Sequence, residues 1–164
     1  LRGIPYYSVS LGLARYQDHP TLEHIIAGLV KNIASGDTFH AIKGRGGYLN
    51  KQELMGLEKS FRDIVISFYA YGQQVDPSYF NLCSKVKIRT LGSVSLEVCY
   101  VANGILDAYV DVRNAVRTID LAAAKLILEE AGGILTNLEG GRIDAKLDAK
   151  GKLSVIAAAN KEAH

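Results

Sequence analysis

Two carboxylates give the stretch between residues 92 and 124 its chemical interest. Asp120 stands at the start of an apolar segment with helical spacing, and Asp111 closes a short strand nine residues earlier. Exposed backbone N–H groups and the helix dipole favour negative charge at a helix start, so a carboxylate costs little there. Asp120 is therefore either a first-turn carboxylate of a helix capped by Thr118 or a ligand for a positively charged group.

Basic side chains flank the same stretch. Over the whole chain 19 Lys and Arg residues against 17 Asp and Glu residues leave a net charge of only +2. This balance argues against a dedicated nucleic-acid-binding domain, which usually carries a strong basic excess. The local cluster is either a solvated edge or a pocket for an anionic small molecule, and its spacing leaves both open. Its members are Lys85, Lys87, Arg89, Arg113 and Arg117.

The elements that must position these residues change in character along the chain. The first 50 residues predict antiparallel strands alone, including residues 22–33, whose apolar side chains also fit helical spacing. Residues 51–62 carry no clear pattern and are interpreted as a connector. From residue 63 onward strands alternate with helices, which is typical of a layered α/β domain.

Within this second part, Ser93 is expected to start a helix that runs to about Asn103, and a second helix is expected over residues 119–131. Glu129 and Glu130 should lie solvated near the end of that helix. Gly44-x-Gly46-Gly47 looks superficially like a phosphate loop but is better explained as a hairpin turn. The remaining predicted elements are a short helix over 78–84 and strands over 63–69, 85–91, 107–112, 134–138 and 153–158.

The bulk composition indicates a globular protein with an ordinary core, since 48% of the 164 residues are hydrophobic and 22% are charged. No run approaches the roughly 18 apolar residues of a membrane span. Cys83 and Cys99 lie in apolar contexts without metal or redox spacing, which favours reduced core residues of a cytoplasmic protein. The first residues lack signal-peptide features and an initiator Met, so the chain is expected to begin inside a longer protein.

An ordered set of short motifs runs through the chain. They are Gly3-x-Pro5 before a serine-containing strand, Phe39-x-Ala41-x-Lys43-Gly44-x-Gly46 with Leu49-Asn50, Arg89-x-x-Gly92-Ser93, Leu106-Asp107-Ala108-Tyr109-Val110-Asp111, Asp120-x-Ala122-Ala123, Glu130-Ala131-Gly132-Gly133 and Ala157-Ala158-Ala159-Asn160. This set resembles the inositol monophosphatase family, and within it the archaeal type that also cleaves fructose 1,6-bisphosphate. No single motif is specific, but their order is, and the resemblance covers essentially all 164 residues.

The resemblance includes one large departure. The main metal motif of the family, Asp-Pro-x-Asp-Gly-Thr, would lie just upstream of Gly3, and a metal-binding Glu would lie further upstream. The chain therefore resembles the C-terminal two-thirds of such an enzyme. The implied fold is an α/β (α+β) layered sandwich of alternating sheets and helices, of the sugar-phosphatase type and N-terminally truncated. Residues 1–50 would be the remaining antiparallel strands of the N-terminal domain, 51–62 a connector and 63–164 the C-terminal α/β domain.

The activity implied by the resemblance is Mg²⁺-dependent hydrolysis of inositol monophosphate and/or fructose 1,6-bisphosphate by a metal-activated water. Asp120 matches a metal-binding Asp of the family. Asp111 matches an acidic position that contacts sugar or inositol hydroxyls, although an exposed strand-end charge remains an alternative. Ile119 replaces a Trp found in many relatives, which is closer to the archaeal branch.

Five further residues are candidates for substrate binding. Arg89 and Arg113 match positions where archaeal relatives bind substrate phosphate, and the alternative is a pair of ordinary surface arginines. Gly92, Ser93 and Val94 start a helix, so their backbone N–H groups could meet substrate oxygens. The alternative for Ser93 is a plain helix cap.

The catalytic residues are expected upstream of Leu1, so this chain alone should be inactive. The resemblance also implies a homodimer and a small sugar or inositol phosphate as the binding partner, without a membrane. Two rival functions stay open: a phosphatase for 3′-phosphoadenosine 5′-phosphate, and a non-catalytic family member that binds protein or RNA.

Overall fold

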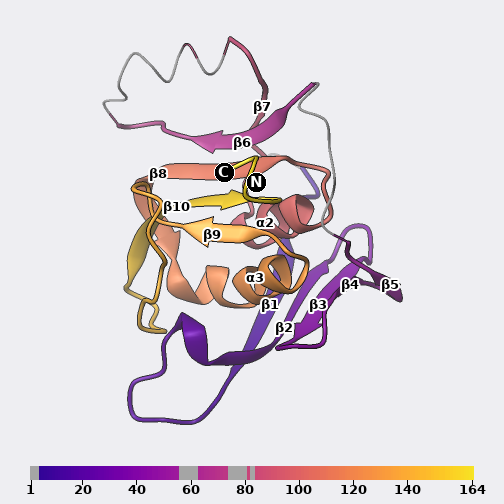
Figure 1. The fold of residues 1–164 in the computed structure, drawn as a ribbon, viewed down its shortest axis with the longest axis vertical. Coiled ribbons are helices and arrows are strands. Elements are labelled where there is room, and N and C mark those ends of the chain that lie inside the picture. Colours follow the sequence, from indigo (N-terminus) through magenta and orange to yellow (C-terminus); the bar gives the residue numbers. More distant parts are fainter. Residues whose placement is uncertain (1–3, 56–62, 74–80, 82–83) are drawn as a thin grey trace.

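The structure is a computed structural model, and it describes residues 4–55, 63–73, 81 and 84–164. Two five-stranded sheets enclose two α-helices in the described part of the chain, which makes a layered α+β fold (Figure 1). The helices are α2 (Val94–Ala102) and α3 (Thr118–Glu130). The first sheet contains β1 (Ser8–Ala14), β2 (Ile25–Asn32), β3 (Thr38–Ile42), β4 (Gly47–Leu49) and β5 (Gln52–Glu53), in that order.

The first sheet is an antiparallel meander, as the sequence predicts. A 3-10 turn, η1 (Leu22–His24), precedes β2, which is a strand despite its helix-like spacing. Gly28 explains why: a Cβ there would lie 2.9 Å from the Ala123 carbonyl oxygen and 3.0 Å from its Cα. The sheet therefore presses directly on the backbone of α3, which only a strand with glycine at this position allows.

The other face of this sheet is apolar and open. Leu11 and Leu13 are each 61% exposed and Ile42 is 52% exposed. Together with Ala27 and Leu29 they line a groove of about 410 Å³. Large exposed apolar side chains in one groove differ from the scattered ones of an ordinary surface.

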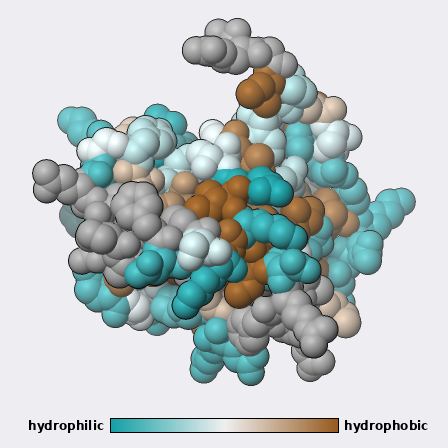
Figure 2. Space-filling view, turned by 90° about the horizontal axis from the view of Figure 1, so that it is seen from above, coloured by the Kyte–Doolittle hydropathy of each residue, from teal (hydrophilic) through white to brown (hydrophobic). Residues whose placement is uncertain are grey.

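The second sheet has the order β7-β6-β8-β10-β9 and mixes parallel with antiparallel pairs. Its inner face packs on the helices, and its outer face carries the half-buried Phe68, Val110 and Ile156 in register. Figure 2, seen from the end that carries β6 and β7, shows hydrophobic surface bordered by hydrophilic residues. The strands are β6 (Val65–Tyr69), β7 (Lys87–Arg89), β8 (Ala108–Arg117), β9 (Ile134–Thr136) and β10 (Lys152–Ala158).

Several predicted bounds are wrong. β8 does not stop at residue 112 but continues to Arg117, because Asn114 adopts a positive φ of 52° at an irregularity where β10 shifts register. Thr118 is the first residue of α3 and not its cap, since its hydroxyl donates to the Asp148 carbonyl. β5 forms inside the expected connector, and the predicted helix over 78–84 lies almost entirely outside the described residues.

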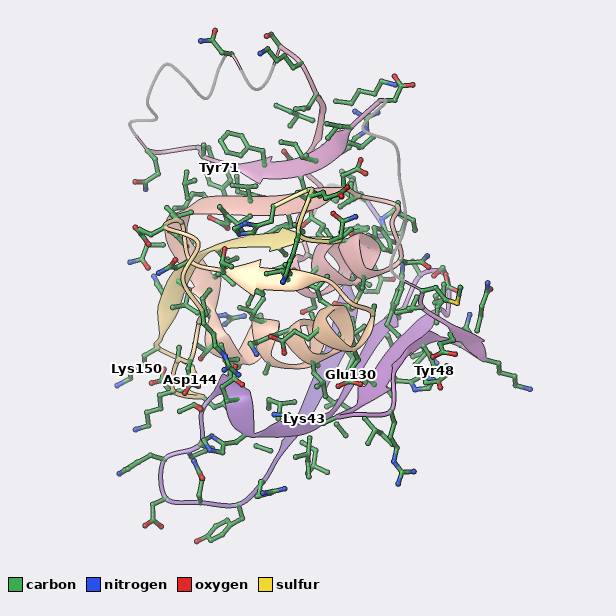
Figure 3. The ribbon with its side chains drawn as sticks, viewed as in Figure 1. Lys43, Tyr48, Tyr71, Glu130, Asp144 and Lys150 are labelled. Carbon is green, nitrogen blue, oxygen red and sulfur yellow. The ribbon has the colours of Figure 1, made fainter. Side chains whose placement is uncertain are left out.

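Glu130 is not solvated as expected. Its carboxylate accepts hydrogen bonds from the backbone N–H groups of Gly44 and Gly46, each 2.8 Å long. Figure 3 shows Glu130 beside Lys43, where α3 ends near the turn between β3 and β4. The glycine-rich segment is thus the predicted hairpin turn, and it binds a carboxylate of the chain itself.

The division into residues 1–50, 51–62 and 63–164 stays a prediction. β5 of the first sheet ends at Glu53 and β6 of the second sheet begins at Val65, and α3 packs against strands of both sheets. Among the described residues no helix is long and apolar enough to cross a membrane. Cys99 is buried and its thiol is free, and burial raises its pKa.

We predict that Gly28→Ala lowers the free energy of unfolding by about 1–3 kcal/mol, because the new methyl group meets helix backbone that cannot yield. Gly12→Ala, at the residue that pairs with Gly28 on β1, is the matched control and should cost less. A Cβ at Gly12 comes nearest to the flexible Cδ1 of Ile25, at 3.3 Å. Urea denaturation of both variants tests this, and equal losses would contradict the account.

A second prediction concerns pH. Burial raises the pKa of Glu23, but the hydrogen bonds and charges of Lys125 and Arg142 outweigh burial and hold the pKa below its ordinary value. A lowered folded-state pKa contributes stability above the unfolded pKa, and this stability is lost as the pH falls through the folded value. The free energy of unfolding should therefore fall more steeply below about pH 4.5 in the natural chain than in Glu23→Gln. Urea denaturation at a series of acidic pH values measures this, and an equal loss of unfolding free energy in the two proteins would contradict the prediction.

Candidate functional site

A cavity of about 430 Å³ lies where the start of the chain meets the starts of both helices. It brings together four of the predicted site residues: Gly92, Ser93, Val94 and Asp120. Arg89, Asp111 and Arg113 are not among its lining residues. The other residues that line it are Tyr6, Tyr7, Ser8, Ser10, Ser95, Arg117 and Ile119.

Asp120 lies in the first turn of α3, and its side chain is 32% exposed. The Arg117 guanidinium donates from Nε to Oδ2 at 2.7 Å and from Nη2 to Oδ1 at 3.1 Å. These hydrogen bonds and the charge of the carboxylate raise the pKa of Arg117. Asp120 thus already faces a cation, supplied by the chain itself.

A direct hydrogen bond joins the two helix starts. Ser95 Oγ, in the first turn of α2, donates to the backbone carbonyl of Asp120 at 2.7 Å. Ser93 Oγ lies 3.2 Å from Ser8 Oγ on β1, and its side chain makes no capping bond. The placement of Asp120 therefore depends on how the first turn of α2 is held.

Of the predicted binding segment Gly92–Val94, the first two backbone N–H groups bond to groups inside the protein and the third remains for a ligand. Gly92 N–H donates to the Tyr69 hydroxyl at 2.6 Å, and Ser93 N–H donates to Glu97 Oε2 at 3.2 Å. Both are therefore used inside the protein. The first N–H groups within a helix have no intrahelical acceptor, so Val94 N–H and Ser95 N–H are the donors that this helix start can offer a ligand.

Two residues that line the cavity have a hydroxyl without a partner. Tyr6 Oη and Ser10 Oγ are buried and have no hydrogen-bond partner among the described residues. Burial, followed by the Glu97 carboxylate, raises the pKa of Tyr6. Buried polar atoms are normally paired, but because both hydroxyls are buried they do not open onto the cavity as it stands. Neither residue was predicted from the sequence, although the alternation of Tyr6, Ser8 and Ser10 along one strand face was a signal.

Asp111 and Arg113 both lie on β8, outside the cavity lining, and pair with each other. Asp111 is 0% exposed, and Arg113 donates to it from Nε at 3.0 Å, from Nη2 at 2.6 Å and from the backbone at 2.9 Å. The guanidinium lies 4.5 Å from the ring centre of Tyr69 and 4.3 Å from that of Tyr71, which Figure 3 labels near the strand end of β6. The hydrogen bonds to Asp111 raise the pKa of Arg113.

Arg89 lies apart from this pair, at the end of β7. Its side chain is exposed and donates to the Ile88 carbonyl oxygen at 2.8 Å. Of the three predicted residues outside the cavity, Arg89 is thus the one that points to solvent-accessible surface.

The described residues contain no group of three or more His, Cys, Asp or Glu side chains that could hold a metal ion. Among the residues that line the cavity Asp120 supplies a carboxylate, whose oxygens are the hard donors that Mg²⁺ prefers. One carboxylate fits part of a magnesium site, but further carboxylates are needed to complete it.

Comparisons with known proteins agree with one another. A model of the inositol monophosphatase family matches residues 1–164. A fructose-1,6-bisphosphatase/inositol-1-monophosphatase of Methanothermobacter thermautotrophicus is 42% identical over 100% of this chain and 60% of its own length. A bifunctional NADP phosphatase/NAD kinase of Methanococcus maripaludis is 37% identical over 95% of this chain and 30% of its own.

Solved structures show the same fold. A Pyrococcus horikoshii protein with similarities to inositol-1 monophosphatase superposes with a TM-score of 0.85 at 34% identity, over 98% of this chain and 60% of that one. The chain thus spans about 60% of the length of such relatives.

The buried ion pair generates a prediction about stability. Arg113→Ala leaves the Asp111 carboxylate buried without its cation, so the free energy of unfolding should fall by about 3–5 kcal/mol. Arg117→Ala removes a similar pair at a half-exposed site and should change the unfolding midpoint far less. Urea titration of both variants measures the difference, and comparable losses would show that burial does not govern the Asp111 pair.

Proposed function

This chain belongs to the inositol monophosphatase family, and on that premise we propose that the protein hydrolyses phosphate monoesters with the help of Mg²⁺. The proposed substrates are inositol monophosphate and/or fructose 1,6-bisphosphate, as the names of several archaeal relatives suggest. The observation that carries the proposal is the cavity, which places the Asp120 carboxylate beside the first turn of α2.

Asp120 is proposed as a metal ligand. For that role it has to leave Arg117, whose half-exposed side chain can move into solvent. The other metal carboxylates are expected from the motif upstream of Leu1, and the relatives are longer than this chain by an amount that could include it. Bound magnesium would polarise phosphate oxygens and lower the pKa of an attacking water.

The remaining cavity residues are proposed to hold the substrate. Val94 N–H and Ser95 N–H can donate to anionic or hydroxyl oxygens at the positive end of the α2 dipole.

Asp111, Arg113 and Arg89 stay predictions as substrate contacts. Asp111 and Arg113 would have to release each other first, whereas Arg89 is already exposed. The homodimer and the cytoplasmic location also stay predictions.

A nucleotide phosphatase is the second candidate function. The observation that favours it is the similarity to proteins named NADP phosphatase, at 37% and 32% identity. A substrate panel that includes NADP and 3′-phosphoadenosine 5′-phosphate separates this reading from the first.

We predict that Asp120→Asn lowers kcat/KM for inositol 1-phosphate at least about 100-fold, because a neutral amide is a poor magnesium ligand. The assay measures phosphate release by the natural full-length protein with Mg²⁺ and after its removal by a chelator. Asp37→Asn is the control, since Asp37 lies at the β2–β3 turn and bonds Ser35 and Asn50.

The 164-residue chain by itself should release no phosphate, because Asp120 cannot complete a metal site alone. If full-length Asp120→Asn keeps the natural rate, or if phosphate release ignores Mg²⁺, the proposed chemistry is wrong. If no phosphate ester is cleaved at all, a binding role for protein or RNA becomes the better account.

A further inference from the structure

Glu97 is a buried carboxylate that the proposed mechanism does not use. It lies in α2 one turn after Ser93 and is 0% exposed. Four donor groups reach its two oxygens, and all four are uncharged. They are Ser67 Oγ, Tyr69 Oη, Leu91 N–H and Ser93 N–H.

Every backbone N–H of the segment Leu91–Ser93 donates either to Glu97 or to the Tyr69 hydroxyl that is bonded to Glu97. Leu91 N–H donates to Glu97 Oε1 at 3.0 Å, and Ser93 N–H donates to Oε2 at 3.2 Å. Gly92 N–H donates to the Tyr69 hydroxyl, which in turn donates to Glu97. The segment that leads from β7 into α2 is therefore fixed around one carboxylate.

The position of this segment determines where the N–H donors at the start of α2 lie relative to the cavity. It ends at the first turn of α2, whose Ser95 hydroxyl bonds the Asp120 carbonyl and whose Ser93 hydroxyl meets Ser8. Gly92, with a φ of +105°, holds a conformation that other residues rarely adopt and that needs support from its surroundings. A shift of Leu91–Ser93 would move the helix start relative to Asp120.

We propose that Glu97 is a positioning residue of the cavity: it folds the Leu91–Ser93 segment inward so that the first turn of α2 faces Asp120 and the substrate. This inference rests on the proposed phosphatase function. Among the described residues, the hydrogen bonds of Glu97 reach the lining residues only at Ser93 N–H and, through the Tyr69 hydroxyl, at Gly92 N–H, so it acts through the backbone.

The geometry requires a carboxylate and not merely a polar side chain. Leu91 N–H meets one oxygen and Ser93 N–H meets the other, and neither N–H can accept a hydrogen bond. A glutamine has one accepting end and one donating end. Either orientation of its amide therefore opposes a backbone N–H with an NH₂ group, and the segment must move.

The test compares Glu97→Gln with Tyr69→Phe in the natural full-length protein, with inositol 1-phosphate and Mg²⁺ as the probe. Tyr69→Phe removes the link to Gly92 but keeps the ring beside Arg113. Both variants should raise KM about five- to tenfold and change kcat less than about twofold, because they displace groups that bind substrate and transition state alike.

Two control variants separate positioning from general stability. Ser67→Ala removes a hydrogen bond to the same carboxylate but touches no N–H of the segment. Glu129→Gln makes the same chemical change on a half-exposed carboxylate, which pairs with the buried Lys125. Both should keep the natural KM, and Ser67→Ala should still lower the melting temperature.

A second readout does not need enzyme activity. In the 164-residue chain, Glu97→Gln and Tyr69→Phe should speed hydrogen exchange at the amides of Leu91, Gly92 and Ser93, while exchange at Asn103 at the other end of α2 stays unchanged. If the natural protein cleaves no phosphate ester, the proposed function fails while this readout still tests the inward fold.

The proposal is overturned if Ser67→Ala raises KM as much as Glu97→Gln, since loss of core stability would then explain both. It is also overturned if KM and the three amides are unchanged in Glu97→Gln and Tyr69→Phe. Should Glu97→Gln fail to fold, Tyr69→Phe alone decides the outcome.

Discussion

The placement of α3 between the two sheets is the constraint on which the rest of the structure depends. The helix is packed so closely that Leu121, Ala123, Ala124 and Ile127 are fully buried. On one side Gly28 of β2, which has no Cβ, leaves room for the backbone of α3 at Ala123. Short side chains on both surfaces bring sheet and helix together, and dispersion contacts at that distance favour a single arrangement. Because Asp120 lies in the first turn of α3, the same packing fixes its backbone position.

Polar contacts along α3 then fix its rotation and height. Near its middle, Lys125 is 4% exposed and bonds Glu23 at 2.8 Å. At the end of α3, the Glu130 carboxylate accepts hydrogen bonds from two N–H groups of the β3–β4 turn. At its beginning, the Asp120 carbonyl accepts a hydrogen bond from the Ser95 hydroxyl. Each contact joins α3 to a different part of the chain. A helix held at three levels can present a carboxylate to a cavity with little freedom.

Much of the fold could be predicted from local pattern. The alternation of β1 and β3 and the apolar run of β6 each appear as strands where they were expected. The order of short motifs was enough to indicate the family, which the family model over residues 1–164 confirms. The helix-like spacing of β2 was resolved by Gly28, whose position in a strand reflects contact with α3.

The site was less predictable, for reasons that lie in tertiary contact. Glu97 looks like an ordinary helix charge, because its partners Ser67 and Tyr69 lie 30 and 28 residues away along the chain. Thr118 looks like a cap until Asp148 engages its hydroxyl. The pairing of Asp111 with Arg113 did have a local signal, since residues two apart on a strand share a face. Composition alone cannot say which of these charges finds a partner inside the protein.

The central proposal is that the cavity between the two helix starts is a metal and phosphate site. The most direct test of it is a crystal structure of the natural full-length protein grown with Mn²⁺ and inositol 1-phosphate, with anomalous scattering to locate the metal. The account predicts a manganese peak within about 2.5 Å of an Asp120 carboxylate oxygen. It also predicts the substrate beside Val94 and Ser95, with Arg117 turned away. Manganese and substrate bound elsewhere, with the Arg117–Asp120 pair intact, would contradict it.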